Sequence, residues 1–65
     1  MEIIVNGESE LVVSNQLSVI LDELGYTGKH FVVELNDVII SKESYTTTVL
    51  TAADRLEIVS FVGGG

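Results

Sequence analysis

The chain ends in the stretch Arg55-Leu56-Glu57-Ile58-Val59-Ser60-Phe61-Val62-Gly63-Gly64-Gly65, and this stretch decides its fold. Apolar residues alternate along 55–62 and predict a β-strand. The two faces of that strand carry Leu56 and Ile58 on one side, and Glu57, Val59 and Phe61 on the other. Three glycines follow directly, and glycine tolerates almost any backbone angle and lets another surface approach closely. We therefore expect residues 63–65 to be a bare, mobile tail that presents the α-carboxylate of Gly65. On the glycines alone, a frayed end or an artificial extension is the alternative.

The other end of the chain predicts a β-hairpin. Residues 1–5 form a short run that is apolar and β-branched, as is typical of a strand. Asn6-Gly7 follows and suits a type I′ turn, which needs positive φ at both central residues. Residues 8–14 then return as a second strand, antiparallel to the first, with Leu11 and Val13 on one face. We expect the final strand of the chain to lie beside the first and parallel to it.

A single helix is predicted between the strands. Its apolar residues recur at the spacing of one helix face: Leu17, Ile20, Leu21 and Leu24. Ser14 or Asn15 can cap its start, and Gly25 suits the left-handed residue after its end. A helix of this length is not stable alone, so it must lie on the sheet.

Two further strands are predicted after the helix. Residues 31–36 form one, with Phe31, Val33 and Leu35 on one face, and residues 38–40 form a shorter one. Tyr45 lies in a polar segment and is expected to fill part of the core. Strands grouped around one helix indicate an α+β fold, with a mixed four- to five-stranded sheet and the helix on one face.

The sheet face away from the helix is predicted to be apolar beside the tail. Val59 and Phe61 point to this face, and Ile4 and Val32 share it on neighbouring strands. The wet side of a one-sided sheet is normally polar, so an exposed apolar cluster indicates a partner-binding patch. Val62 continues the patch toward the tail. The alternative is that the loop 38–50 folds over part of it.

The composition disfavours several functions. Ten acidic against three basic residues give a net charge of −7, which argues against nucleic acid and anionic membranes as partners. The chain has no cysteine and one histidine, His30, so no Cys/His pair or histidine metal cluster can form. We expect no catalytic residue and no metal site. No apolar run approaches the roughly 20 residues of a membrane span, and no signal-peptide pattern begins the chain, so we expect a cytoplasmic protein.

Several motifs together resemble the ThiS family, the β-grasp, ubiquitin-like sulfur carriers of thiazole formation in thiamine biosynthesis. The resemblance covers essentially the whole chain. Its segments are the helix ending in Leu24-Gly25, the strand ending in Asn36, residues 38–45, residues 54–59 and, most specifically, Phe61-Val62-Gly63-Gly64-Gly65. The chain departs from the family at Ala53-Asp54, where Gly-Asp is frequent, and in its third terminal glycine.

The resemblance implies a β-grasp domain over residues 1–62 and a flexible tail over 63–65. It implies that a ThiF-type adenylyltransferase uses ATP to adenylate the carboxylate of Gly65 and that a sulfur donor converts the adenylate into a thiocarboxylate. A ThiG-type thiazole synthase would then accept the sulfur. Gly63 and Gly64 would thread into the partner's active site, and the docking face would comprise Ile4, Val32, Val59, Phe61 and Val62. The chain would be a carrier with no bound cofactor, and not an enzyme.

Two alternatives stay open. The small subunit of molybdopterin synthase shares the carboxyl chemistry, but that family tends to be longer and often has prolines before its glycine pair, whereas this chain has none. The other alternative is a ubiquitin-like modifier or interaction module, whose tail is ligated to lysines or has no chemistry.

Overall fold

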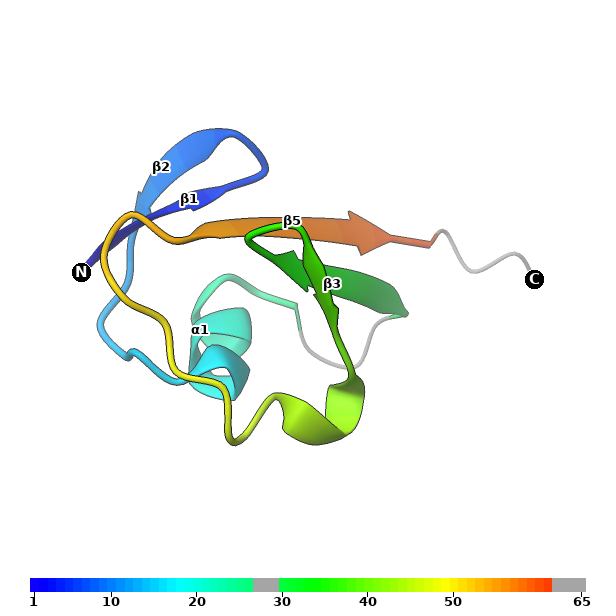
Figure 1. Cartoon of the computed structure of the whole chain (residues 1–65). Coiled ribbons are helices and arrows are strands. Elements are labelled where there is room, and N and C mark those ends of the chain that lie inside the picture. The colour runs from blue at the N-terminus through cyan, green and yellow to red at the C-terminus, as the bar shows by residue number, and fades with distance from the viewer. Residues whose placement is uncertain (27–29, 62–65) are drawn as a thin grey trace.

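A computed structural model describes residues 1–26 and 30–61 of the chain. Its elements are β1 (Glu2–Val5), β2 (Glu8–Leu11), α1 (Leu17–Glu23), β3 (Phe31–Leu35), β4 (Val38–Ile40), the 3-10 helix η1 (Lys42–Ser44) and β5 (Arg55–Ser60). The strands form one sheet in the order β2-β1-β5-β3-β4, and α1 covers one face of it (Figure 1). β1 and β5 are parallel and the other neighbours are antiparallel. The predicted α+β, β-grasp architecture is confirmed, with five strands in the sheet.

The β1–β2 hairpin has the predicted turn but a shorter second strand. Asn6 and Gly7 have φ of 50° and 83°, the positive values that a type I′ turn requires. β2 ends at Leu11, which is 82% exposed, while Val12 is buried in the core and Val13 is 96% exposed. The expected strand over 8–14 is therefore too long, whereas the exposures agree with the expectation that Leu11 and Val13 share one face.

The residues that follow β2 are bound by α1. The carboxylate of Glu23 accepts hydrogen bonds from the N–H groups of Val13 and Ser14, at 2.8 and 3.0 Å. These bonds hold residues 13 and 14 against the helix directly after Val12, whose N–H still donates to the carbonyl of Met1 at 2.9 Å. Val12 takes a core position because it lies on the same side of the chain as Glu10, the cross-strand partner of the buried Ile3.

The helix begins without the expected side-chain cap. Gln16 is the N-cap residue and makes no side-chain cap hydrogen bond, whereas the hydroxyl of Ser14 accepts a bond from the N–H of Gln16 at 3.0 Å. Gly25 follows the helix with φ of 89°, as expected for a left-handed residue at this point. No helix in residues 1–26 and 30–61 has the length and apolar content that crossing a membrane requires.

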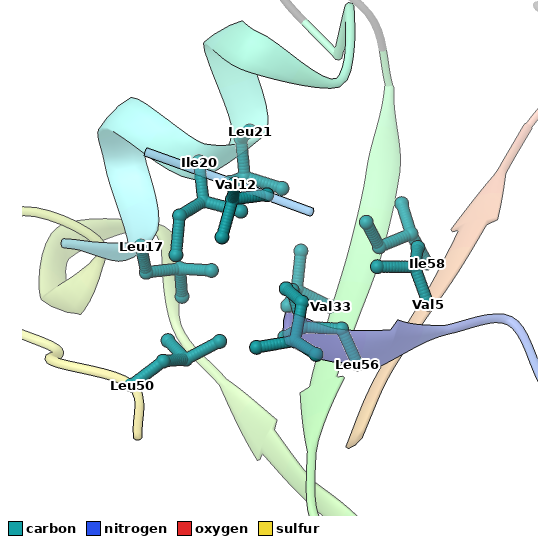
Figure 2. Close-up of a cluster of buried hydrophobic side chains, with 10 residues drawn as sticks. Val5, Val12, Leu17, Ile20, Leu21, Val33, Leu50, Leu56 and Ile58 are labelled. Atoms are coloured by element: carbon teal, nitrogen blue, oxygen red, sulfur yellow. The ribbon is translucent and has the colours of Figure 1, made fainter. Parts of the chain in front are cut away.

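One hydrophobic core lies between α1 and the sheet (Figure 2). Helix, sheet and connecting segments all contribute to it: Ile3, Val5, Val12, Leu17, Ile20, Leu21, Val33, Leu50, Leu56 and Ile58. The two buried β5 residues are the pair predicted to face the helix. The core therefore fixes which side of β5 is left to the solvent.

The segment between β4 and β5 packs beside the helix. The carbonyls of Tyr45 and Thr48 accept hydrogen bonds from the N–H groups of Ser18 and Leu17, at 3.1 and 2.9 Å. Leu50 is fully buried and Tyr45 packs against the core, as predicted for the tyrosine. The segment belongs to the helix side, so the alternative that it covers the opposite face is wrong for its described contacts.

Candidate functional site

The end of β5 leads directly into the glycine tail. β3 runs antiparallel beside β5 as far as Phe31, which lies opposite Ser60. Beyond this pair, the N–H of Phe61 donates to the carbonyl of His30 at 2.9 Å. The backbone is thus held against the sheet up to Phe61, the last residue of the described range 30–61.

Three apolar side chains lie near one another on the open face, which we define as the sheet face opposite α1. Val32 and Val59 are direct cross-strand partners, and Phe61, the residue after β5, lies two residues beyond Val59 on the same side, with its N–H still bonded to the His30 carbonyl. Val59 and Phe61 are both 55% exposed, and Val32 is half-buried. We call Val32, Val59 and Phe61 the apolar patch. The structure brings these three predicted residues together, and their binding role stays a prediction.

Ile4 lies apart from this patch. It shares the open face but pairs with Arg55, at the opposite end of β5. Arg55 and Val59 are separated by about 13 Å along the strand at the usual rise per residue. Glu57 points to the same face between them, so the predicted docking residues form a patch and one separate apolar position.

Two carboxylates border the apolar patch. Glu34 and Glu57 are direct cross-strand partners on the open face, and like charges in this position repel. Ile39 pairs with Glu34 from β4 and is 68% exposed on the same face. Sequence reasoning missed Ile39, although alternation within the short strand 38–40 and its register with β3 would have placed it here.

Aromatic rings support the end of β3 from the core side. The Phe31 ring meets Tyr26 edge to face at 5.7 Å between centroids and stacks with Tyr45 at 6.3 Å. Burial raises the pKa of the Tyr45 phenol. This cluster fixes Phe31, and through the cross-strand pair it also fixes Ser60, immediately before the patch residue Phe61.

Two carboxyl groups have pKa values that local hydrogen bonds lower. Hydrogen bonds from the N–H groups of Val13 and Ser14 lower the pKa of Glu23. The N–H of Thr51 lowers the pKa of Asp54, and the Asn36 amide lowers it further. Both groups stabilise loops outside the apolar patch.

The described residues contain no cluster of metal-binding side chains. No three side chains of metal-binding type cluster within 1–26 and 30–61, and His30 is an exposed residue before β3. Val62, Gly63, Gly64 and Gly65 lie outside the described residues. The roles predicted for these four positions therefore stay predictions.

Comparison with known proteins identifies the relatives of this chain. The model of the ThiS family matches residues 3–65. A crystal structure of the thiamine biosynthesis protein ThiS from Geobacter metallireducens matches with a TM-score of 0.80 and 28% identity, covering all of both chains. The uncharacterized protein ycf40 of Pyropia yezoensis is 35% identical over 49 residues, which are 75% of this chain and 69% of that protein.

Two thiazole synthases also match across the whole chain. The protein from Paramagnetospirillum magneticum is 38% identical over 66 residues, and the one from Magnetococcus marinus is 35% identical over 66 residues. The chain spans 20% of the length of each of these two relatives.

Proposed function

The chain belongs to the ThiS family, and from this membership we propose that it is a sulfur carrier in thiamine biosynthesis. The observation that carries the proposal is the extent of the family match, which includes the glycine tail as well as the folded domain. The likeness to a ThiS structure over the full length of both chains supports it.

The proposed chemistry takes place at the carboxylate of Gly65. On a ThiF-type adenylyltransferase, a carboxylate oxygen attacks the α-phosphorus of ATP, pyrophosphate leaves and an acyl-adenylate forms. A sulfide-level donor then forms a C–S bond at the carbonyl carbon while the C–O bond to AMP breaks, which leaves a thiocarboxylate. The sulfur has no side-chain thiol to occupy, because the chain contains no cysteine. The chain is a co-substrate in this scheme and not an enzyme.

The tail residues Gly63 and Gly64 are proposed to thread into the partner's active site. Three extended residues span about 10 Å, and the absence of side chains suits a narrow cleft. Fixing them costs about 1–2 kcal/mol per residue in backbone entropy. Burial of the exposed halves of Val59 and Phe61 contributes on the order of 1 kcal/mol each, so docking needs polar contacts in addition.

The proposed acceptor of the sulfur is a ThiG-type thiazole synthase. The two thiazole synthase relatives support the thiazole pathway over the molybdopterin pathway. The absence of proline before the glycines supports the same choice.

An intact-mass measurement tests the proposal. The protein is incubated with ATP, the cognate adenylating enzyme and a sulfur donor, and we expect one oxygen to be replaced by sulfur at the terminus. An unchanged mass beside an enzyme that loads its own control carrier would contradict sulfur carriage. Deletion of all three glycines, residues 63–65, is the matched control, because it should abolish the exchange without changing the circular dichroism spectrum. Transfer of the sulfur in vitro to thiazole or to molybdopterin then decides the pathway.

A further inference from the structure

β5 continues beyond the end of its neighbour β1. The N–H of Asn6 donates to the carbonyl of Leu56 at 2.8 Å, and the side-chain oxygen of Asn6 accepts the N–H of Ile58 at 2.7 Å. The chain then turns away at Gly7. Figure 1 shows β5 running on past the hairpin turn.

Three backbone groups of β5 lie beyond the contact with Asn6 and point to the edge along which β1 pairs with the first part of β5. Backbone groups of a strand alternate between its two edges, and the bonds of Arg55 and Phe61 to the β3 side fix the alternation. The carbonyl of Ile58 and the N–H and carbonyl of Ser60 therefore face the β1 side. None of the hydrogen bonds within residues 1–26 and 30–61 uses these three groups.

The opposite edge of the same residues is fully occupied. β3 pairs with β5 through Ser60, and His30 extends the ladder to Phe61. The second half of β5 thus has one edge that is paired with β3. Its other edge, which we call the open edge, carries backbone groups that are unpaired within the described residues. An open edge of this kind is a template for a strand from another chain.

The usual means of blocking such an edge are missing at this place. Proteins protect exposed edges with proline, lysine, a bulge or a covering loop. The chain contains no proline, and its three basic residues are Lys29, Lys42 and Arg55, so none lies within 58–61. The flanking side chains Val59 and Phe61 are apolar and exposed on the open face.

We propose that the open edge of β5 at residues 58–60 receives an extended strand of the adenylating partner, which adds to the sheet in the place that β1 vacates. The negative charge of this chain indicates which side chains the added partner strand carries. Glu57 borders the edge and the net charge is −7, so the complementary strand carries basic side chains together with apolar ones that cover Val59 and Phe61. A second copy of this chain carries the same acidic charge, which opposes pairing between copies.

The identity of the partner rests on the proposed function, whereas the open edge does not. The edge contacts supply the polar interactions that the apolar patch alone lacks. A strand bound here also lies alongside the last residues before the tail. It therefore sets the direction in which the tail leaves the sheet.

Substitution at Ser60 tests the inference, because its N–H faces the open edge and not β3. Ser60→Pro removes this donor, and Ser60→Ala keeps it while removing the hydroxyl. Calorimetric titration with the adenylating enzyme should show about a tenfold loss of affinity for Ser60→Pro and none for Ser60→Ala. Wild-type affinity of a folded Ser60→Pro variant overturns the inference.

Amide hydrogen exchange on the wild-type protein gives a second test that does not depend on the variant folding. The Ser60 amide should exchange rapidly in the free protein and slowly in the complex, while the Phe61 amide is protected in both. An unchanged Ser60 rate in a saturated complex overturns the inference, and protection that grows with the concentration of the free protein assigns the edge to a second copy instead. Sulfur loading is read separately from intact mass. Loading without Ser60 protection therefore removes only the edge proposal, and protection without loading removes only the sulfur chemistry.

Discussion

The side-chain oxygen of Asn6 accepts a hydrogen bond from the N–H of Ile58 at 2.7 Å, across 52 residues of sequence. The same residue has φ of 50° and forms the first central position of the hairpin turn. Asn6 thus joins the turn that ends β1 to the middle of β5. Asn6 therefore has the positive φ that the turn requires and also adds one hydrogen bond to the parallel pairing of β1 with β5.

Replacing Asn6 should separate these two roles. Asn6→Gly keeps the positive φ but loses the acceptor, and Asn6→Ala loses both. We expect Asn6→Gly to lower the free energy of unfolding by about 1 kcal/mol and Asn6→Ala by about 2 kcal/mol, measured by urea denaturation. Equal stability of Asn6→Gly and the wild type would show that the bond to Ile58 contributes nothing.

Phe61→Asp should weaken partner binding more than it lowers stability. The side chain is 55% exposed on the open face, so the free energy of unfolding should change by less than about 0.5 kcal/mol. The affinity for the adenylating enzyme should fall at least about tenfold. Val13→Asp is the control, because it makes the same change at a 96% exposed position outside the apolar patch. Similar losses of binding in both variants would point to the added charge and not to the patch.

Glu57→Gln should stabilise the free protein. It removes the repulsion between Glu57 and its cross-strand partner Glu34, which is worth about 0.2–1 kcal/mol for a pair on one sheet face. Added salt should stabilise the wild type more than the variant, because screening weakens the same repulsion. Glu43→Gln in η1 serves as the control for a general reduction of charge. If both variants respond alike, the cross-strand pair has no specific role.

Asp37→Gly should also raise the stability. Asn36 and Asp37 have φ of 49° and 71°, so they form a second turn with positive φ at both central residues, and glycine adopts this conformation without strain at the second. The substitution removes the ion pair between Arg55 and Asp37, but both side chains are well exposed and such pairs are worth little. Relief of the left-handed strain outweighs the added entropy of glycine in the unfolded chain, so we expect a net gain of about 0.5 kcal/mol by urea denaturation. A loss of stability would mean that the ion pair outweighs the backbone strain.

The hydrogen bonds of Glu23 to the loop after β2 should contribute less to the stability of the protein in acid. Hydrogen bonds from Val13 and Ser14 lower the pKa of this carboxyl below its ordinary value of 4.5. A lowered folded-state pKa stabilises the protein above the unfolded-state pKa, and this contribution is lost as the pH falls through the folded-state value. Glu23→Gln should therefore lower the melting temperature at pH 7, with the difference from wild type disappearing in acid. Asp22→Asn, at a neighbouring exposed position of α1, is the control for the general loss of one negative charge.

The elements that the sequence predicts well are those set by local patterns. The helix face of Leu17, Ile20 and Leu21 follows from spacing alone, and the Asn6-Gly7 turn follows from the need for positive φ. The alternation in β5 correctly separates Leu56 and Ile58 from the exposed side. These features need no knowledge of distant contacts.

The features that escaped prediction depend on residues far apart in the sequence. The contact of Glu23 with the N–H groups of Val13 and Ser14 joins α1 to the chain after β2, and no local pattern indicates it. The position of the segment around Tyr45 depends on hydrogen bonds to the first turn of α1. At the candidate site, periodicity found Val32, Val59 and Phe61, but only the register of β4 against β3 adds Ile39 and only that of β1 against β5 separates Ile4.

The parallel pairing of β1 with β5 gives the order of synthesis a role in folding. The ribosome makes β1 first, yet its central neighbour β5 is made only after residues 6–54 have been translated. Until then β1 has only the β2 side of its ladder, and the core lacks Leu56 and Ile58. Closing a contact across so many residues is slow compared with forming the local hairpin and helix. A chain that is interrupted before residue 55 lacks the central strand and cannot complete its sheet, so it stays open to proteolysis. The domain therefore reaches its folded state only when the segment that leads to the tail is present.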